Sequence, residues 1–146
     1  KMGEDTVEYF PKITGQSINP SRSKDILLHG FTKIVPSGHW AVYGSDAKLI
    51  QDLAKADPQL AERIHPDFPN IMAEVVWAVR NEMALKIEDI LSRRVRMLIL
   101  DAQAALDSAE KVVKLMAFEL GKDEAWMEME LEDFRNVAEK YLIKSS

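Results

Sequence analysis

The chain has 146 residues, of which 47% are hydrophobic and 29% charged, and this length suits one domain with one hydrophobic core. It contains no cysteine, which excludes disulfides, thiolate metal sites and a cysteine nucleophile. The net charge of −5 argues against nucleic acid as a partner, and no apolar run approaches the about 20 residues that a membrane span needs.

The first third of the chain predicts little regular structure. Residues 1–10 are typical of a short helix, or of the end of one, which Pro11 would stop. The stretch 14–24 is rich in Gly, Ser, Asn and Pro, which is typical of a loop or linker. The apolar runs Ile26–Leu28 and Trp40–Tyr43 are candidates for short extended segments.

From Ser45 onward the pattern is helical. Asp57, followed by proline, and Asp123 are predicted N-caps, Ser108 is a third, and Gly121 is a predicted left-handed helix stop. The sequence therefore predicts an all-α fold, a single compact, bundle-like domain of about five or six helices with an irregular N-terminal third.

Three charged residues fall inside the apolar sectors of this helical pattern. On a helical wheel of about 100° per residue that starts at Ile71, Glu82 lies in the buried sector. If the next helix continues through residues 87–102, Arg94 and Asp101 lie inside its apolar sector too. An unpaired charge in a core costs several kcal/mol, so we expect these groups to be paired or to line a cavity.

Two explanations for these charges remain open. The first is a structural ion network that fixes how the helices dock, made of Glu82, Arg94, Asp101, Asp89 and Arg93. The second is a patch that binds an anion or an acidic or phosphorylated partner, made of Arg93, Arg94 and Arg96.

No pattern of catalytic or cofactor-binding residues is visible. The sequence contains neither G-x-G-x-x-G nor a P-loop. Its three histidines, His29, His39 and His65, stand in loop-like settings without metal-ligand spacing. We therefore assign no catalytic, cofactor-binding or metal-binding residue, and we expect the chain itself to bind no cofactor.

One long stretch carries a specific resemblance. Residues 73–105 read AEVVWAVRNEMALKIEDILSRRVRMLILDAQAA, and further matching segments are LLHGF at 27–31, YGSDA at 43–47 and VVKLMAFELG at 112–121. Together these segments resemble the C-terminal domain of FAD-dependent glycerol-3-phosphate dehydrogenases. In that family, a segment that contacts cofactor and substrate precedes a helix like KMGEDTVEYF, so the chain is expected to be a fragment that starts after it.

The resemblance implies what the parent enzyme does. The parent would oxidise sn-glycerol 3-phosphate to dihydroxyacetone phosphate, reducing FAD, and would pass the electrons to a membrane quinone or, in a related oxidase subclass, to oxygen. It would be a peripheral protein on the cytoplasmic face of the inner membrane. The chain lacks the calcium-binding extension of mitochondrial members, which favours a bacterial enzyme.

The resemblance also implies three parts of the chain. Residues 1–10 would be the end of a helix of the preceding FAD domain, 11–44 a linker and irregular segment, and 45–146 the helical C-terminal cap. The expected partners are the FAD and substrate domains of the same parent. A homodimer is also compatible with the resemblance. The alternative function is a free-standing helical module that binds an acidic or phosphorylated partner.

Overall fold

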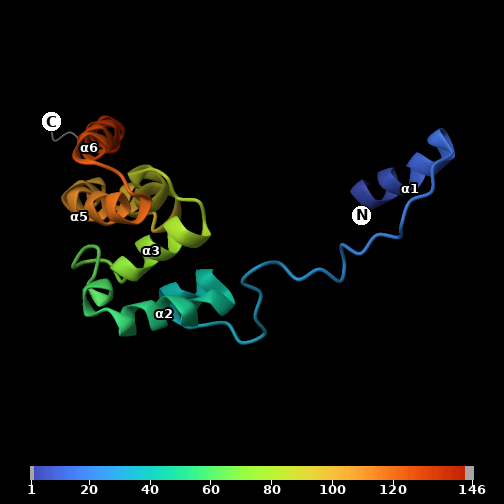
Figure 1. The fold of residues 1–146 in the computed structure, drawn as a ribbon, viewed down its shortest axis with the longest axis horizontal. Helices are drawn as coiled ribbons and strands as arrows, with labels where there is room; N and C mark the ends of the chain where they lie inside the picture. The colour runs from blue at the N-terminus through green and yellow to red at the C-terminus, as the bar shows by residue number, and fades with distance from the viewer. Residues whose placement is uncertain (1, 144–146) are drawn as a thin grey trace.

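The described part of the chain is built from helices. The computed structural model describes residues 2–143, and every regular element in this range is helical, which confirms the predicted all-α class. Within it, one isolated bridge joins Arg63 to Ile71 and no strand forms. The first helix, α1 (Met2–Thr14), stands apart from a body of packed helices, and residues 15–37 connect the two (Figure 1).

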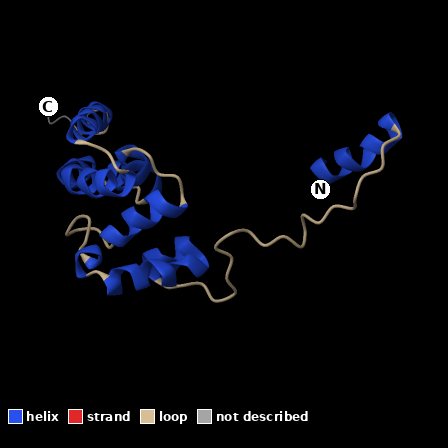
Figure 2. Cartoon of the chain, in the orientation of Figure 1, coloured by secondary structure: helices blue, strands red, loops and turns tan. Residues whose placement is uncertain are grey.

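The helical body consists of longer and shorter helices joined by loops (Figure 2). In chain order its elements are η1 (Gly38–Asp46), α2 (Ala47–Ala56), η2 (Pro58–Ala61), α3 (Met72–Asn81), η3 (Asp89–Arg94), α4 (Met97–Leu100), α5 (Ala102–Leu120) and α6 (Glu124–Ala138). Helix α3 packs against α2 and α5, and α5 packs against α4 and α6. The extended segment predicted at Trp40–Tyr43 is wrong, because these residues lie within the 3₁₀ helix η1.

Side chains set the ends of the two longest helices of the body. Oδ1 of Asp101 accepts a hydrogen bond from the main-chain N–H of Ala104 in α5, and Asp123 caps α6 in the same way. Gly121 ends α5 with a φ of 64°, so the caps predicted at Asp123 and Gly121 are confirmed. The cap predicted at Ser108 is wrong, because this residue is buried within α5 and its hydroxyl donates to the carbonyl of Ala104.

The first helix extends further than the sequence predicts. It continues through Pro11 to Thr14, so the prediction that Pro11 ends it is wrong. Proline lacks the N–H that would bond the carbonyl of Val7. Val7 is exposed, so water can satisfy that carbonyl and only one helical hydrogen bond is lost. Lys1, the first residue of the predicted helix, lies outside the described residues.

The continuous helix predicted over residues 87–102 is wrong. The chain forms the π-helical turn η3, then takes a left-handed conformation at Arg96, with a φ of 59°, before the single turn of α4. It is extended again at Asp101, where α5 begins. Each break resets the helical phase, so the wheel positions of Arg94 and Asp101 no longer hold.

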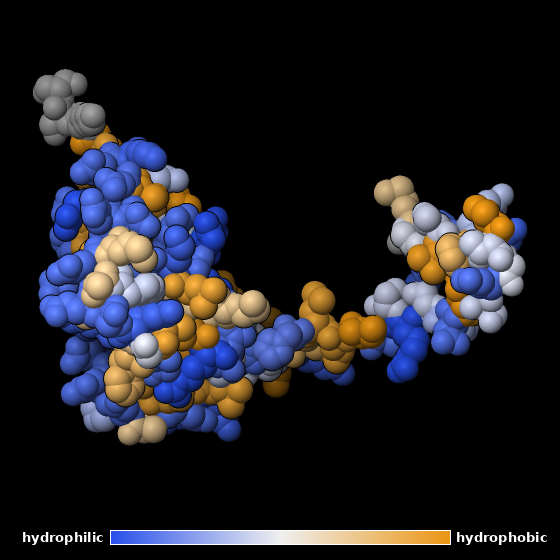
Figure 3. Space-filling view, turned by 45° about the horizontal axis from the view of Figure 1, so that its top comes forward, coloured by the Kyte–Doolittle hydropathy of each residue, from blue (hydrophilic) through white to orange (hydrophobic). Residues whose placement is uncertain are grey.

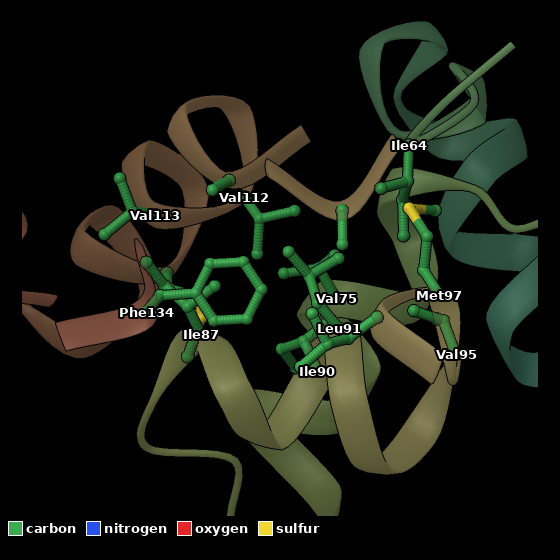
Figure 4. Packing of buried hydrophobic residues seen from close by; sticks show 14 of the residues in the cluster. Ile64, Val75, Ile87, Ile90, Leu91, Val95, Met97, Val112, Val113 and Phe134 are labelled. Carbon is green, nitrogen blue, oxygen red and sulfur yellow. The ribbon is translucent and has the colours of Figure 1, made fainter. Parts of the chain in front are cut away.

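The main hydrophobic core lies where α3, η3, α5 and α6 meet (Figure 4). Its most buried large side chains include Val75, Ile87, Ile90, Leu91, Val112, Val113 and Phe134. Each fully buried aliphatic or phenyl group of this kind contributes roughly 1.5–3 kcal/mol to folding. A smaller cluster of Ile50, Ala73 and Trp77 joins α2 to α3 and also contacts Tyr43 of η1. These two clusters hold in place the segments that carry the charged residues described next.

Candidate functional site

Arg94 joins the end of α3 to the start of η3. Its Nε donates to Oε2 of Glu82 at 2.7 Å, and one terminal nitrogen donates to the main-chain carbonyl of Asp89 at 2.8 Å. The other terminal nitrogen donates to the main-chain carbonyl of Glu82. Glu82 follows the last residue of α3, so Arg94 satisfies a main-chain carbonyl that the end of this helix leaves free. Both side chains are partly exposed, 22% for Arg94 and 32% for Glu82. The ion pair therefore lies at the edge of the hydrophobic core and not inside it.

The other two arginines of the predicted network and patch lie at the surface. Arg93 donates to Oδ1 of Asp89 at 2.8 Å and to Oε1 of Glu88 at 3.0 Å. Arg96 is exposed and has no ion pair among the described residues. Carboxylates and main-chain carbonyls therefore occupy the guanidinium groups of Arg93 and Arg94, and only Arg96 keeps its donors free for a ligand within the described structure.

Asp101 has a different role from the one predicted. It is exposed, forms no ion pair with another described residue and caps α5. Its predicted place in the ion network is wrong because the helix that would have turned it inward breaks before it.

The most buried carboxylate among the described residues is that of Glu74, which the sequence did not single out. Glu74 is 2% exposed in α3. One oxygen accepts hydrogen bonds from the hydroxyl of Tyr43 at 2.7 Å and the amide of Asn70 at 2.8 Å. The other accepts the main-chain N–H of Ile71 at 2.8 Å and lies 3.4 Å from Nε2 of His39. We call these residues the Glu74 cluster.

The Glu74 cluster holds η1 against α3. Burial, the negative charge of Glu74 and the hydrogen bond to it raise the pKa of Tyr43 well above its ordinary value. Tyr43 therefore stays a neutral donor at physiological pH. Because three hydrogen-bond donors already satisfy the carboxylate of Glu74, this group is built to fix structure and not to take a proton from a substrate.

A second buried carboxylate, Glu130, performs a similar task elsewhere. It lies on α6, is 3% exposed and accepts the main-chain N–H of Ile87 at 3.2 Å. This contact ties α6 to the turn that precedes η3. The amphipathic pattern of α6 does not reveal it, because the partner is main chain from a distant segment.

A small open cavity lies next to the Glu74 cluster. It has a volume of about 300 Å³, and its lining includes His29, Tyr43, Asp46 and Glu82. Nε2 of His29 lies 2.7 Å from Oδ2 of the buried Asp46, while the His29 ring is largely exposed. No group of described residues has three side chains placed to hold a metal ion. The sequence places His29 in a loop-like setting, and only the fold brings it to Asp46.

Comparisons with known proteins give the broader context. Residues 29–127 match the family model described as the C-terminal domain of alpha-glycerophosphate oxidase. The mitochondrial glycerol-3-phosphate dehydrogenase of Rattus norvegicus is 31% identical over 152 residues, which cover 90% of this chain and 21% of that protein. A glycerol-3-phosphate dehydrogenase of Synechocystis is 46% identical over 55 residues, which cover 38% of this chain and 10% of that protein. No solved structure matches the chain.

The chain spans only about 21% of the length of the mammalian relatives that it matches. Among the described residues, no helix is both long and apolar enough to cross a membrane.

Proposed function

Because this chain belongs to the family of the C-terminal domain of alpha-glycerophosphate oxidase, we propose that it is the helical C-terminal domain of an FAD-dependent glycerol-3-phosphate dehydrogenase. The parent oxidises sn-glycerol 3-phosphate to dihydroxyacetone phosphate, reduces FAD and passes the electrons to a quinone. The chain itself contributes no catalytic group and stabilises the parent. The family match over residues 29–127 is the observation that carries this proposal.

Two features of the chain support placing the flavin in another part of the parent. A dinucleotide is held by a glycine-rich turn between a strand and a helix N-terminus, where main-chain N–H groups meet the pyrophosphate. The described residues form no strand, and the sequence has no G-x-G-x-x-G. We therefore assign the FAD and the reacting groups to the rest of the parent.

The contacts of the charged residues support a structural role. Glu74 is buried and satisfied by three donors, and Arg94 is held by Glu82 and by main-chain carbonyls. Groups held this firmly position helices and are poor acids, bases or ligands. The alternative of an interaction module that uses Arg93, Arg94 and Arg96 gains no support from this geometry.

The same proposal covers organisation and location. Residues 1–10 belong to the end of a helix of the preceding domain, and 45–146 form the cap. Residues 11–44 form a linker whose last part, from Gly38 onward, packs on the cap as η1. The isolation of α1 from the helical body supports a boundary between them. A quinone acceptor is dissolved in the membrane, so we place the parent at the cytoplasmic face of the inner membrane as a peripheral protein.

The experiment uses the full-length parent, purified with its flavin. Anaerobic addition of sn-glycerol 3-phosphate is expected to bleach the oxidised flavin absorbance, whereas its enantiomer, sn-glycerol 1-phosphate, is expected to leave the spectrum unchanged. A parent without flavin, or a flavin that sn-glycerol 3-phosphate does not reduce, would overturn the proposal.

A further inference from the structure

A strip of large apolar side chains lies uncovered beside the helical body. We define the apolar strip as Leu27, Leu28, Phe31, Ile34, Val35 and Val42. Their exposure ranges from 52% at Phe31 to 85% at Ile34. Figure 3 shows hydrophobic residues along the extended segment between the helical body and α1. Single exposed apolar residues are normal, but a group of them gathered on one short segment is typical of a surface that another protein part covers.

The apolar strip is attached to the helical body at a defined point. The main-chain N–H of Ser45 donates to the carbonyl of Gly30 at 2.9 Å, and His29 pairs with Asp46 at 2.7 Å. Gly44 lies so close to the same carbonyl that a Cβ there would stand 1.9 Å from it, so no other residue fits. Gly44 also has a φ of 54°. These contacts fix residues 29 and 30, next to Phe31, against the helical body, and so attach the strip to the domain at this point, as a preformed docking surface requires.

We propose that the apolar strip is the surface on which the rest of the parent polypeptide docks, with His29 as a polar anchor at its centre. This inference rests on the proposed function. The mammalian relatives have about four-fifths of their length outside the region matched here, since that region is 21% of each. The family match begins at residue 29, so Phe31, Ile34, Val35 and Val42 belong to the family domain itself.

The backbone of the strip argues against a lipid phase as its occupant. Residues 26–37 form turns and irregular structure and no helix. Lipid could not satisfy the main-chain N–H and C=O groups of such a segment, whereas a protein surface with polar groups among apolar ones can. His29 keeps its second ring nitrogen available for this contact, because Nε2 faces Asp46.

The test places aspartate on the strip in the full-length parent. Phe31→Asp and, independently, Val42→Asp are expected to accelerate release of the C-terminal domain by limited proteolysis by about tenfold or more, which corresponds to about 1.4 kcal/mol of lost docking. Phe118→Asp is the matched control, because Phe118 is 80% exposed and lies on α5, which carries none of the strip residues. In the 146-residue chain alone, all three substitutions are expected to leave the unfolding temperature within about 2 °C of the wild type, because each side chain is exposed there.

The outcomes separate the possible occupants. Release that is unchanged in both strip variants, or accelerated equally by Phe118→Asp, overturns the proposal. Loss of a dimer measured by light scattering, with unchanged release, assigns the strip to a second copy and also overturns it. If the strip variants no longer sediment with phosphatidylglycerol vesicles but are released at the unchanged rate, the strip binds a membrane and the proposal is overturned. Flavin reduction by sn-glycerol 3-phosphate in the wild-type parent tests the proposed function separately.

Discussion

Arg94 and Glu82 are joined by a hydrogen bond of 2.7 Å across the break between α3 and η3. The same guanidinium also holds main-chain carbonyls on both sides of this break. The Arg94 side chain therefore connects α3 to the π-helical turn η3, where no continuous helical hydrogen bonding joins them. It thereby fixes the orientation of η3 relative to α3. These three hydrogen bonds need a planar group with donors on several nitrogens, which lysine lacks.

We expect Arg94→Lys to lower the free energy of unfolding by about 1.5–3 kcal/mol, because a single ammonium cannot replace three directed hydrogen bonds. Urea denaturation measures this change. Arg93→Lys is the control and should cost less than about 1 kcal/mol, because Arg93 makes exposed ion pairs. Equal costs for the two substitutions would contradict the bridging role of Arg94.

Even the conservative replacement of Glu74 by glutamine should destabilise the chain. Glu74→Gln keeps the shape but turns one acceptor into a donor that faces other donors, so we expect a loss of about 2–4 kcal/mol. Glu132→Gln on α6 is the control, because Glu132 is exposed and should change stability by less than about 0.5 kcal/mol. Thermal unfolding followed by circular dichroism makes the comparison, and a mild effect at Glu74 would contradict the arrangement of three donors around its carboxylate.

Tyr43 should make stability fall at alkaline pH. Its pKa is raised in the folded chain by burial and by Glu74, while in the unfolded chain it keeps its ordinary value of 10.0. Above that pH the unfolded chain loses a proton that the folded chain keeps, so the free energy of unfolding falls by about 1.4 kcal/mol per pH unit from this group. Tyr43→Phe should remove this part of the slope and cost about 1–2 kcal/mol at neutral pH.

The control for this pH dependence is Tyr141→Phe, because Tyr141 is exposed. Urea titrations between about pH 9 and about pH 11 compare the three proteins. If Tyr43→Phe has the same alkaline slope as Tyr141→Phe, then Tyr43 is not the group that links stability to pH.

Arg96 should tolerate glycine. It is exposed and has a left-handed φ of 59°, a conformation that glycine adopts without steric cost. We expect Arg96→Gly to be neutral or to stabilise the chain by up to about 1 kcal/mol, whereas Arg93→Gly, within η3, should destabilise it. Differential scanning calorimetry distinguishes these signs, and a clear loss of stability in Arg96→Gly would point to a contact of the arginine side chain that the structure does not contain.

Local signals allowed a good part of the fold to be predicted. Asp123 and Gly121 act through hydrogen bonds and dihedral angles within a few residues, so their sequence context reveals them. Asp57 is a cap for the same reason and accepts the main-chain N–H of Gln59. The helical breaks around η3 have no comparable signal, because the turning residues are Met83 and Arg96 and not glycine.

The candidate site was harder to predict because its contacts are not local. Tyr43 and Glu74 are 31 positions apart, and only the packing of η1 on α3 brings them together. Half of the cluster did carry a local signal, since Glu74 accepts from Asn70 and Ile71 at capping-box spacing. The structure joins Glu82 to Arg94, although the continuous helix used to orient Arg94 is absent.

The most direct test of the account is the flavin content of two proteins prepared side by side. Each protein is incubated with excess FAD, and unbound FAD is then removed by gel filtration. The 146-residue chain should elute free of flavin, while the full-length parent should retain roughly one FAD per chain. Stoichiometric FAD on the 146-residue chain, or a parent that retains none, would contradict the claim that this chain is a structural domain of a flavoenzyme whose redox centre lies elsewhere.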